Sequence, residues 1–167
     1  MNSCEIEIAV ARHFDYRANL IVPNVYRGLN FKYELDLIIV YPSYYASEVE
    51  IKVSISDLKA EKNKSSYAHE SDKIKRLYFA VPYNLKDKSI ALIPERAGLL
   101  SVNLVKGFWV VTLEKAPRIN KSARKLEEWE VNRLRELAAM RIWSLKEALL
   151  KEKRKRESQE KRRDNGH

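Results

Sequence analysis

The sequence predicts one α/β or α+β domain, built on a β-sheet with flanking helices and followed by a long C-terminal helix. Helical and strand patterns alternate along residues 1–118, and two strong strand patterns adjoin each other at 33–41 and 46–54. From residue 119 onward the pattern becomes purely helical. At 167 residues, the chain is long enough to bury one hydrophobic core.

The N-terminal elements are a helix and an interrupted strand. Ile6, Val10 and Phe14 recur at helical spacing within 4–14, which predicts a short amphipathic helix. The run 19–28 is rich in strand-forming residues but contains Pro23, which lacks a backbone N–H. It therefore suits an edge strand or an irregular extended segment.

Two strands follow at 33–41 and 46–54, joined by a turn at Pro42 and Ser43. Further along, Ser56 is expected to cap a helix that opens at Asp57. The remaining predicted elements are a helical piece at 72–76, a strand at 77–81, a loop that turns at Pro94 and Gly98 into a strand, and a last strand at 107–113.

The C-terminal part divides into an amphipathic helix and a basic tail. Apolar residues recur at near-helical spacing over 119–150, and we expect this helix to pack on the domain or on a partner subunit. These residues are Leu126, Val131, Leu134, Ala138, Leu145 and Leu149. Residues 151–167 carry eight Lys or Arg against four acids and no apolar face, which predicts a disordered tail. The composition of the tail fits a solubilising extension as well as a DNA-binding arm.

Composition indicates a polyanionic partner. The formal net charge is +9 and the isoelectric point is about 9.6, and Lys or Arg that neutralise phosphates release condensed counterions. The single Cys4 excludes an internal disulfide and a thiolate zinc cluster. No apolar run is long enough for a membrane span, so we expect a soluble cytoplasmic protein that binds nucleic acid rather than a membrane.

Three charged residues on the two central strands are the candidate catalytic centre. Alternation places Glu48, Glu50 and Lys52 on one face of their strand. In a hairpin centred on Ser43, Asp36 would face Glu50, and like charges in directly opposed positions repel. A divalent cation with hard oxygen ligands, such as Mg²⁺, would offset that repulsion.

These residues resemble the signature of the PD-(D/E)xK nuclease superfamily, although Leu35 replaces the usual Pro before the first acid. The resemblance implies a restriction-endonuclease-like mixed central sheet in which Asp36, Glu50 and the Ile51 carbonyl hold Mg²⁺, or Mn²⁺, beside Lys52. A glutamate of the first helix often completes such sites. Glu7 is the better match and Glu5 the alternative, and either could equally be an ordinary solvated acid.

The resemblance extends over about residues 5–105. The runs VEIKVSISDLKAEKNK, KIKRLYFAVP and IPERAGLL are similar to the MmcB-like group of DNA-repair endonucleases and related phage or bacterial proteins. This resemblance implies a metal-dependent endonuclease that acts on DNA in repair, recombination or phage DNA processing. Cleavage of both strands of a duplex would favour a homodimer, but the oligomeric state stays open.

Basic residues after the second central strand are candidates for phosphate contact, although an ordinary solvated basic face would look the same. They are Lys59, Lys62, Lys64, Lys73, Lys75 and Arg76. Two other functions remain open. One is an inactive nucleic-acid-binding scaffold of the same fold, and the other is an interaction protein that assembles through its C-terminal helix.

Overall fold

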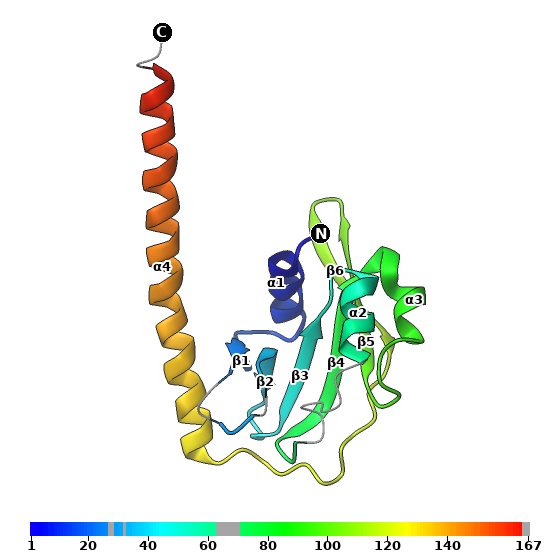
Figure 1. Ribbon diagram of the computed structural model, residues 1–167. Helices are drawn as coiled ribbons and strands as arrows, with labels where there is room; N and C mark the ends of the chain where they lie inside the picture. The colour runs from blue at the N-terminus through cyan, green and yellow to red at the C-terminus, as the bar shows by residue number, and fades with distance from the viewer. Residues whose placement is uncertain (27–28, 32, 63–70, 165–167) are drawn as a thin grey trace.

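The structure is a computed structural model that describes residues 1–167 except 27–28, 32, 63–70 and 165–167, together with the side chains of 61–62 and 160–164. A six-stranded mixed sheet forms its centre, helices flank the sheet, and a long C-terminal helix rises beside it (Figure 1). The predicted fold class is therefore confirmed.

The strands lie in the sheet in their order along the chain. They are β1 (Leu20–Val25), β2 (Leu35–Val40), β3 (Ala46–Ile51), β4 (Ile74–Pro82), β5 (Gly98–Val105) and β6 (Phe108–Lys115). β1, β2 and β3 pair antiparallel, β4 and β5 continue parallel to β3, and β6 returns antiparallel to β5. The carboxyl ends of β3, β4 and β5 consequently meet at one edge of the sheet.

Helices cover both faces of the sheet, as the mixed topology requires. They are α1 (Ser3–His13), α2 (Ile55–Lys62), the short 3₁₀ helix η2 (Tyr83–Leu85), α3 (Lys86–Ile90) and α4 (Glu128–Asp164). On one face, Ile6 and Val10 of α1 pack with Val49 and Ala80. On the other, Leu58 of α2 packs with Phe79.

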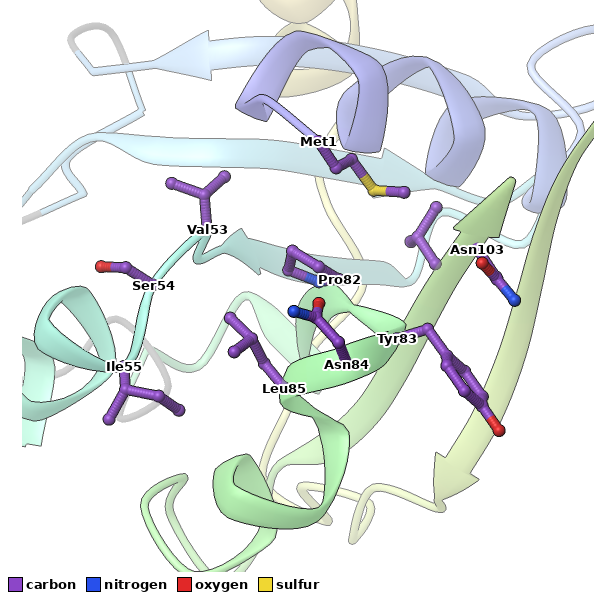
Figure 2. Close-up of a pocket in the computed structure, with 10 residues that line it drawn as sticks. Met1, Val53, Ser54, Ile55, Pro82, Tyr83, Asn84, Leu85 and Asn103 are labelled. Atoms are coloured by element: carbon purple, nitrogen blue, oxygen red, sulfur yellow. The ribbon is translucent and has the colours of Figure 1, made fainter. Parts of the chain in front are cut away.

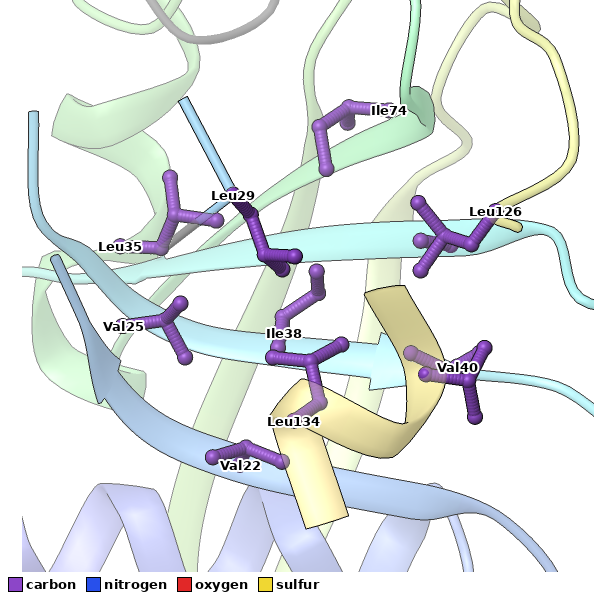
Figure 3. Close-up of a cluster of buried hydrophobic side chains, with 11 residues drawn as sticks. Val22, Val25, Leu29, Leu35, Ile38, Val40, Ile74, Leu126 and Leu134 are labelled. Atoms are coloured by element: carbon purple, nitrogen blue, oxygen red, sulfur yellow. The ribbon is translucent and has the colours of Figure 1, made fainter. Parts of the chain in front are cut away.

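The first turns of α4 close a third apolar cluster. Leu134 lies among Val22, Ile38 and Val40 of the first two strands, and Leu126 from the preceding segment joins them (Figure 3). Pro23 lies within β1 at the edge of the sheet, where a missing N–H costs no ladder bond, as predicted.

Several boundaries differ from the sequence-based expectation. Ser54, and not Ser56, accepts the backbone N–H of Asp57 at 3.2 Å, so α2 opens two residues earlier, at Ile55. The predicted helical piece at 72–76 is wrong, because β4 already begins at Ile74. α3 was not predicted, because its five residues are too few for a periodic apolar pattern.

The C-terminal helix is both later and longer than predicted. Residues 120–127 form no helix: they turn at 121–122 and are held to the sheet by two backbone hydrogen bonds. The Asn120 N–H donates to the Lys75 carbonyl at 2.9 Å, and the Leu126 N–H donates to the Tyr44 carbonyl at 2.8 Å. α4 then continues to Asp164, so the expectation of a disordered tail from residue 151 is wrong up to that point. Strong helix formers and pairs such as Arg156 with Glu152, at 2.6 Å, stabilise a helix that buries no apolar face there.

No helix in the described ranges combines the length and apolar composition that a bilayer crossing requires.

Candidate active site

The register of β2 and β3 brings the predicted acids to the same end of the hairpin. Leu37 pairs with Val49 and Val40 with Ala46, as predicted for a turn centred on Ser43. One step further in this register, Asp36 lies across from Glu50. The backbone pairing of β2 with β3 ends at Leu37. Beyond it, the Ile51 N–H of β3 donates to the side chain of Asp36.

Asp36 is held by the backbone of β3. Its Oδ2 accepts the Ile51 N–H at 2.7 Å, and the Lys52 N–H on the opposite side of β3 donates to the Ala80 carbonyl of β4 at 3.0 Å. β3 is thus fixed from both neighbours at the residues that carry the predicted chemistry.

Glu50 and Lys52 form an ion pair. Lys52 Nζ lies 2.8 Å from Glu50 Oε2, and the two side chains are only 12% and 11% exposed. Both residues point to the same face of β3, as the alternation predicted. Three of the predicted catalytic residues, Asp36, Glu50 and Lys52, therefore come together at the carboxyl end of β3.

Glu48 is an acidic residue of this site that the sequence-based assignment left out. It is 1% exposed and lies between Ile38 and Leu77 on the neighbouring strands. Its side chain shares a hydrogen bond with Glu50, while its Oε2 has no hydrogen-bond partner among the described residues. Burial, followed by the charge of Glu50, raises its pKa well above the usual value. The signal was present in the alternation, which places Glu48 on the face of Glu50.

Arg96 partly compensates this buried acid. It lies in the loop before β5, and the charge of its guanidinium lowers the pKa of Glu48, against the larger opposing effect of burial. The IPERAGLL run therefore contributes a cation to the site, a role the sequence alone did not indicate.

Glu7 of α1 is the helix acid whose pKa is affected by a residue of the site. Burial, and then the negative charge of Asp36, raises the pKa of Glu7, so the two carboxylates lie within electrostatic reach. Glu5 is engaged differently, because its Oε2 accepts the Asn2 N–H at 2.7 Å in a capping box at the start of α1. Of the two alternatives, the geometry favours Glu7.

The donor atoms suit Mg²⁺ in kind, although the described residues contain no group of three Asp, Glu, His or Cys side chains already placed to hold a metal. Mg²⁺ needs only one or two protein carboxylates and keeps several waters. Asp36, Glu50 and the Ile51 carbonyl supply hard oxygens, and Glu48 adds a further carboxylate on the face of β3 that carries Glu50. The residues present therefore fit a divalent cation.

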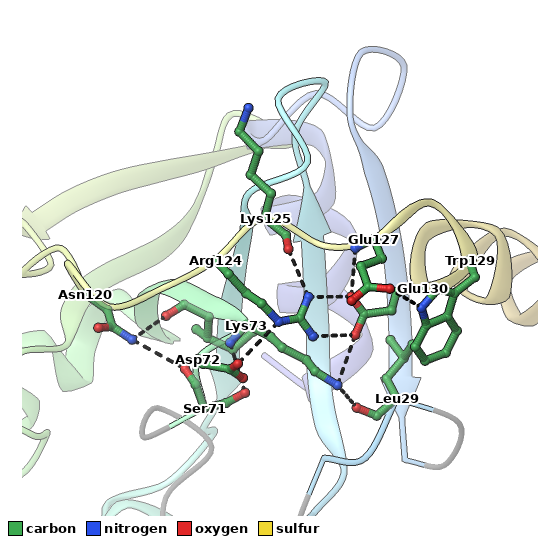
Figure 4. Close-up of polar contacts among 11 residues, drawn as sticks. Leu29, Ser71, Asp72, Lys73, Asn120, Arg124, Lys125, Glu127, Trp129 and Glu130 are labelled. Atoms are coloured by element: carbon green, nitrogen blue, oxygen red, sulfur yellow. Dashed lines mark hydrogen bonds and ion pairs between the residues drawn. The ribbon is translucent and has the colours of Figure 1, made fainter.

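The described members of the predicted basic cluster have different surroundings. Lys73 is 9% exposed, and its ammonium donates to the Leu29 carbonyl and lies 3.1 Å from Glu130 (Figure 4). Its assignment as a phosphate contact is therefore wrong, because it is a buried partner of α4. Lys75 lies with its Nζ 3.2 Å from the centroid of the Tyr45 ring, in a cation–π contact.

The other members of that cluster have separate surroundings. Lys59 is exposed on α2, and Arg76 is half-buried on β4. The side chain of Lys62 and the whole of Lys64 lie outside the described residues.

Replacing Glu48 by Gln is expected to raise the free energy of unfolding at pH 8 in the presence of a chelator, by about 1–3 kcal/mol. The raised pKa means that the folded chain holds the Glu48 proton more tightly than the unfolded chain, so wild-type stability falls as the pH rises above 4.5. The gap between variant and wild type should widen from pH 5 to pH 8 in urea unfolding. Glu95→Gln, at an exposed side chain, is the control, and a less stable Glu48→Gln protein at both pH values would contradict this account.

Comparisons with known proteins show that a solved structure has a similar fold. No protein-family model matches the chain, and no curated protein matches it significantly. It is similar to a solved structure from Silicibacter pomeroyi, the SPO1766 protein of unknown function, with a TM-score of 0.58 and 17% sequence identity. The match covers 89% of this chain and 92% of that one, and at this identity it concerns the fold alone.

Proposed function

We propose that this chain is a metal-dependent nuclease of the PD-(D/E)xK type, which hydrolyses phosphodiester bonds of DNA. The observation that carries the proposal is the hairpin register that sets Asp36 across from Glu50, with the Glu50–Lys52 ion pair and the buried Glu48 on the same face of β3. A basic chain with a net charge of +9 supports a polyanionic substrate.

Each residue would have a defined role. Asp36, Glu50 and the Ile51 carbonyl would hold Mg²⁺ or Mn²⁺, and Glu7 would add negative charge from α1. When bound, the cation would polarise a nonbridging phosphate oxygen and lower the pKa of the attacking water. Lys52 would orient that water and stabilise the negative charge that develops on the phosphate.

Arg96 is a positioning residue in this scheme. Its attraction for Glu48 offsets part of the repulsion among the acids when no cation is bound. It thereby helps the folded chain to keep a cluster that would otherwise destabilise it.

The test is a cleavage panel of single-stranded, duplex, nicked and branched DNA, and RNA, with Mg²⁺ or Mn²⁺. We expect at least one substrate to be cut by the wild type, and Lys52→Ala to cut it about 100-fold more slowly or worse. Lys121→Ala removes the same charge from an exposed position between β6 and α4 and should retain the rate to within about twofold.

Two results would count against the proposal. One is that no substrate in the panel is cut with either metal. With affinity for DNA intact, that outcome would favour an inactive nucleic-acid-binding scaffold. The other is that Lys52→Ala and Lys121→Ala both cut at the wild-type rate.

A further inference from the structure

A pocket of about 470 Å³ lies beside the candidate active site, at the edge where the parallel strands end (Figure 2). Val53 and Ser54, which follow Lys52 directly, form one side, and Pro82 at the end of β4 forms the floor with Asn84 of η2. Ligands of open α/β sheets bind outside the carboxyl ends of the parallel strands. The pocket occupies that position.

The side chains that line the pocket are uncharged, with a few polar groups on apolar walls. The lining consists of Met1, Val53, Ser54, Ile55, Pro82, Tyr83, Asn84, Leu85, Val102 and Asn103. None of these side chains carries a charge at neutral pH, and the α-ammonium group of Met1 is the one charge among these residues. Its volume falls in the range of about 300–1,000 Å³ that is typical of small-molecule sites.

The polar and aromatic groups match the features of a nucleobase. Tyr83 at the rim is 46% exposed, and aromatic rings bind bases by stacking without sequence preference. The amides of Asn84 and Asn103 can each donate to and accept from the edge of a base. Lys86, which does not line the pocket, lies with its Nζ 4.3 Å from the centroid of the Tyr83 ring in a cation–π contact.

We propose that this pocket takes one unpaired nucleobase adjacent to the phosphodiester that is cut. The inference rests on the proposed function and defines its substrate class. A base inside a duplex is stacked and paired, and it reaches a pocket only when it is extruded or already unpaired. Preferred substrates are therefore nucleic acids with a single-stranded segment, a bulge or a branch, and not an intact duplex.

The experiment is equilibrium binding in the presence of a chelator, so that no cleavage occurs. The probes are a perfect duplex and the same duplex carrying one unpaired fluorescent adenine analogue. We expect the wild type to bind the bulged probe about tenfold more tightly than the duplex, and to change the fluorescence of the analogue as it enters the pocket. Tyr83→Ala should lose about tenfold in affinity for the bulged probe only, together with the fluorescence change.

Matched controls separate this inference from the nuclease proposal. Tyr16→Ala, at a tyrosine that is 52% exposed and does not line the pocket, should leave both affinities unchanged, and thermal unfolding checks that each variant is folded. Asn84→Ala should lower the affinity for the bulged probe and leave the affinity for the duplex unchanged, as expected for Tyr83→Ala.

The outcomes are distinguishable. Equal affinity for both probes, or equal losses for both probes in Tyr83→Ala, would overturn the pocket assignment even if the protein cuts DNA. Selective binding that depends on Tyr83, without cleavage in any metal, would support the pocket and overturn the nuclease.

Discussion

Asp36→Asn is expected to reduce metal-dependent cleavage by about 1,000-fold or more, while the protein stays folded. The Asn carbonyl oxygen can still accept the Ile51 N–H that Asp36 accepts at 2.7 Å, so the hairpin keeps its geometry. The variant removes the negative charge that would bind the cation. The rate is measured with the best substrate of the cleavage panel.

A second substitution at this position separates charge from structure. Asp36→Ala removes the acceptor as well and leaves the half-buried Ile51 N–H without it, which should cost about 1–3 kcal/mol of unfolding free energy. Asp87→Asn on the exposed first turn of α3 is the matched control, with cleavage and stability close to wild type. Cleavage by Asp36→Asn at the wild-type rate would show that Asp36 holds the backbone and does no chemistry.

Glu130→Gln is expected to destabilise the protein by about 3–5 kcal/mol, because it removes the shared anion of two cations in a buried site. Arg124 donates to both carboxylate oxygens of Glu130, at 2.7 and 2.9 Å, and Lys73 lies 3.1 Å away (Figure 4). Glu130 also accepts the backbone N–H of Glu127 at 2.8 Å, which caps the start of α4. The variant therefore loosens α4 and the β4 end of the sheet together, which urea unfolding measures.

The pH dependence of this effect has a definite sign. Burial alone would raise the pKa of Glu130, but hydrogen bonds from Arg124, Glu127 and Lys73 outweigh it and lower the pKa from 4.5 to about 2. The stabilisation, about 3 kcal/mol, is present above pH 4.5 and is lost as the pH falls toward 2. The stability gap between wild type and Glu130→Gln should shrink over that window.

The control for this cluster is an exposed ion pair on the same helix. Glu136 lies 2.9 Å from Arg133, and its side chain is 62% exposed. Glu136→Gln should change the free energy of unfolding by less than about 1 kcal/mol. Two results would contradict the role given to Glu130. One is that Glu136→Gln lowers the free energy of unfolding as much as Glu130→Gln does. The other is that the stability difference between wild type and Glu130→Gln does not change with pH.

The hairpin could be predicted from the sequence because its information is local. Alternation over six-residue strands and a turn at Ser43 determine the register, and that register brings Asp36 to Glu50. The same alternation contained Glu48, but its burial depends on Leu77 and Arg96, which lie far along the chain. Burial of a charged residue cannot be predicted from its own neighbours in sequence.

Lys73 illustrates the same limit. In the sequence it is one of several lysines after the second central strand, whereas in the structure it is buried against Glu130 and Leu29, 57 and 44 residues away. The prediction that the last helix ends near residue 150 was wrong for another reason. Loss of the apolar face ends packing but not the helix, and α4 continues to Asp164 on helix-forming residues.

Calorimetric titration of the wild-type protein with Mn²⁺ tests most directly whether the carboxylates of β2 and β3 form a cation site. We expect one saturable binding event that disappears in Asp36→Asn and persists in Asp87→Asn. Absence of binding to the wild type, or equal binding to Asp36→Asn, would contradict the account.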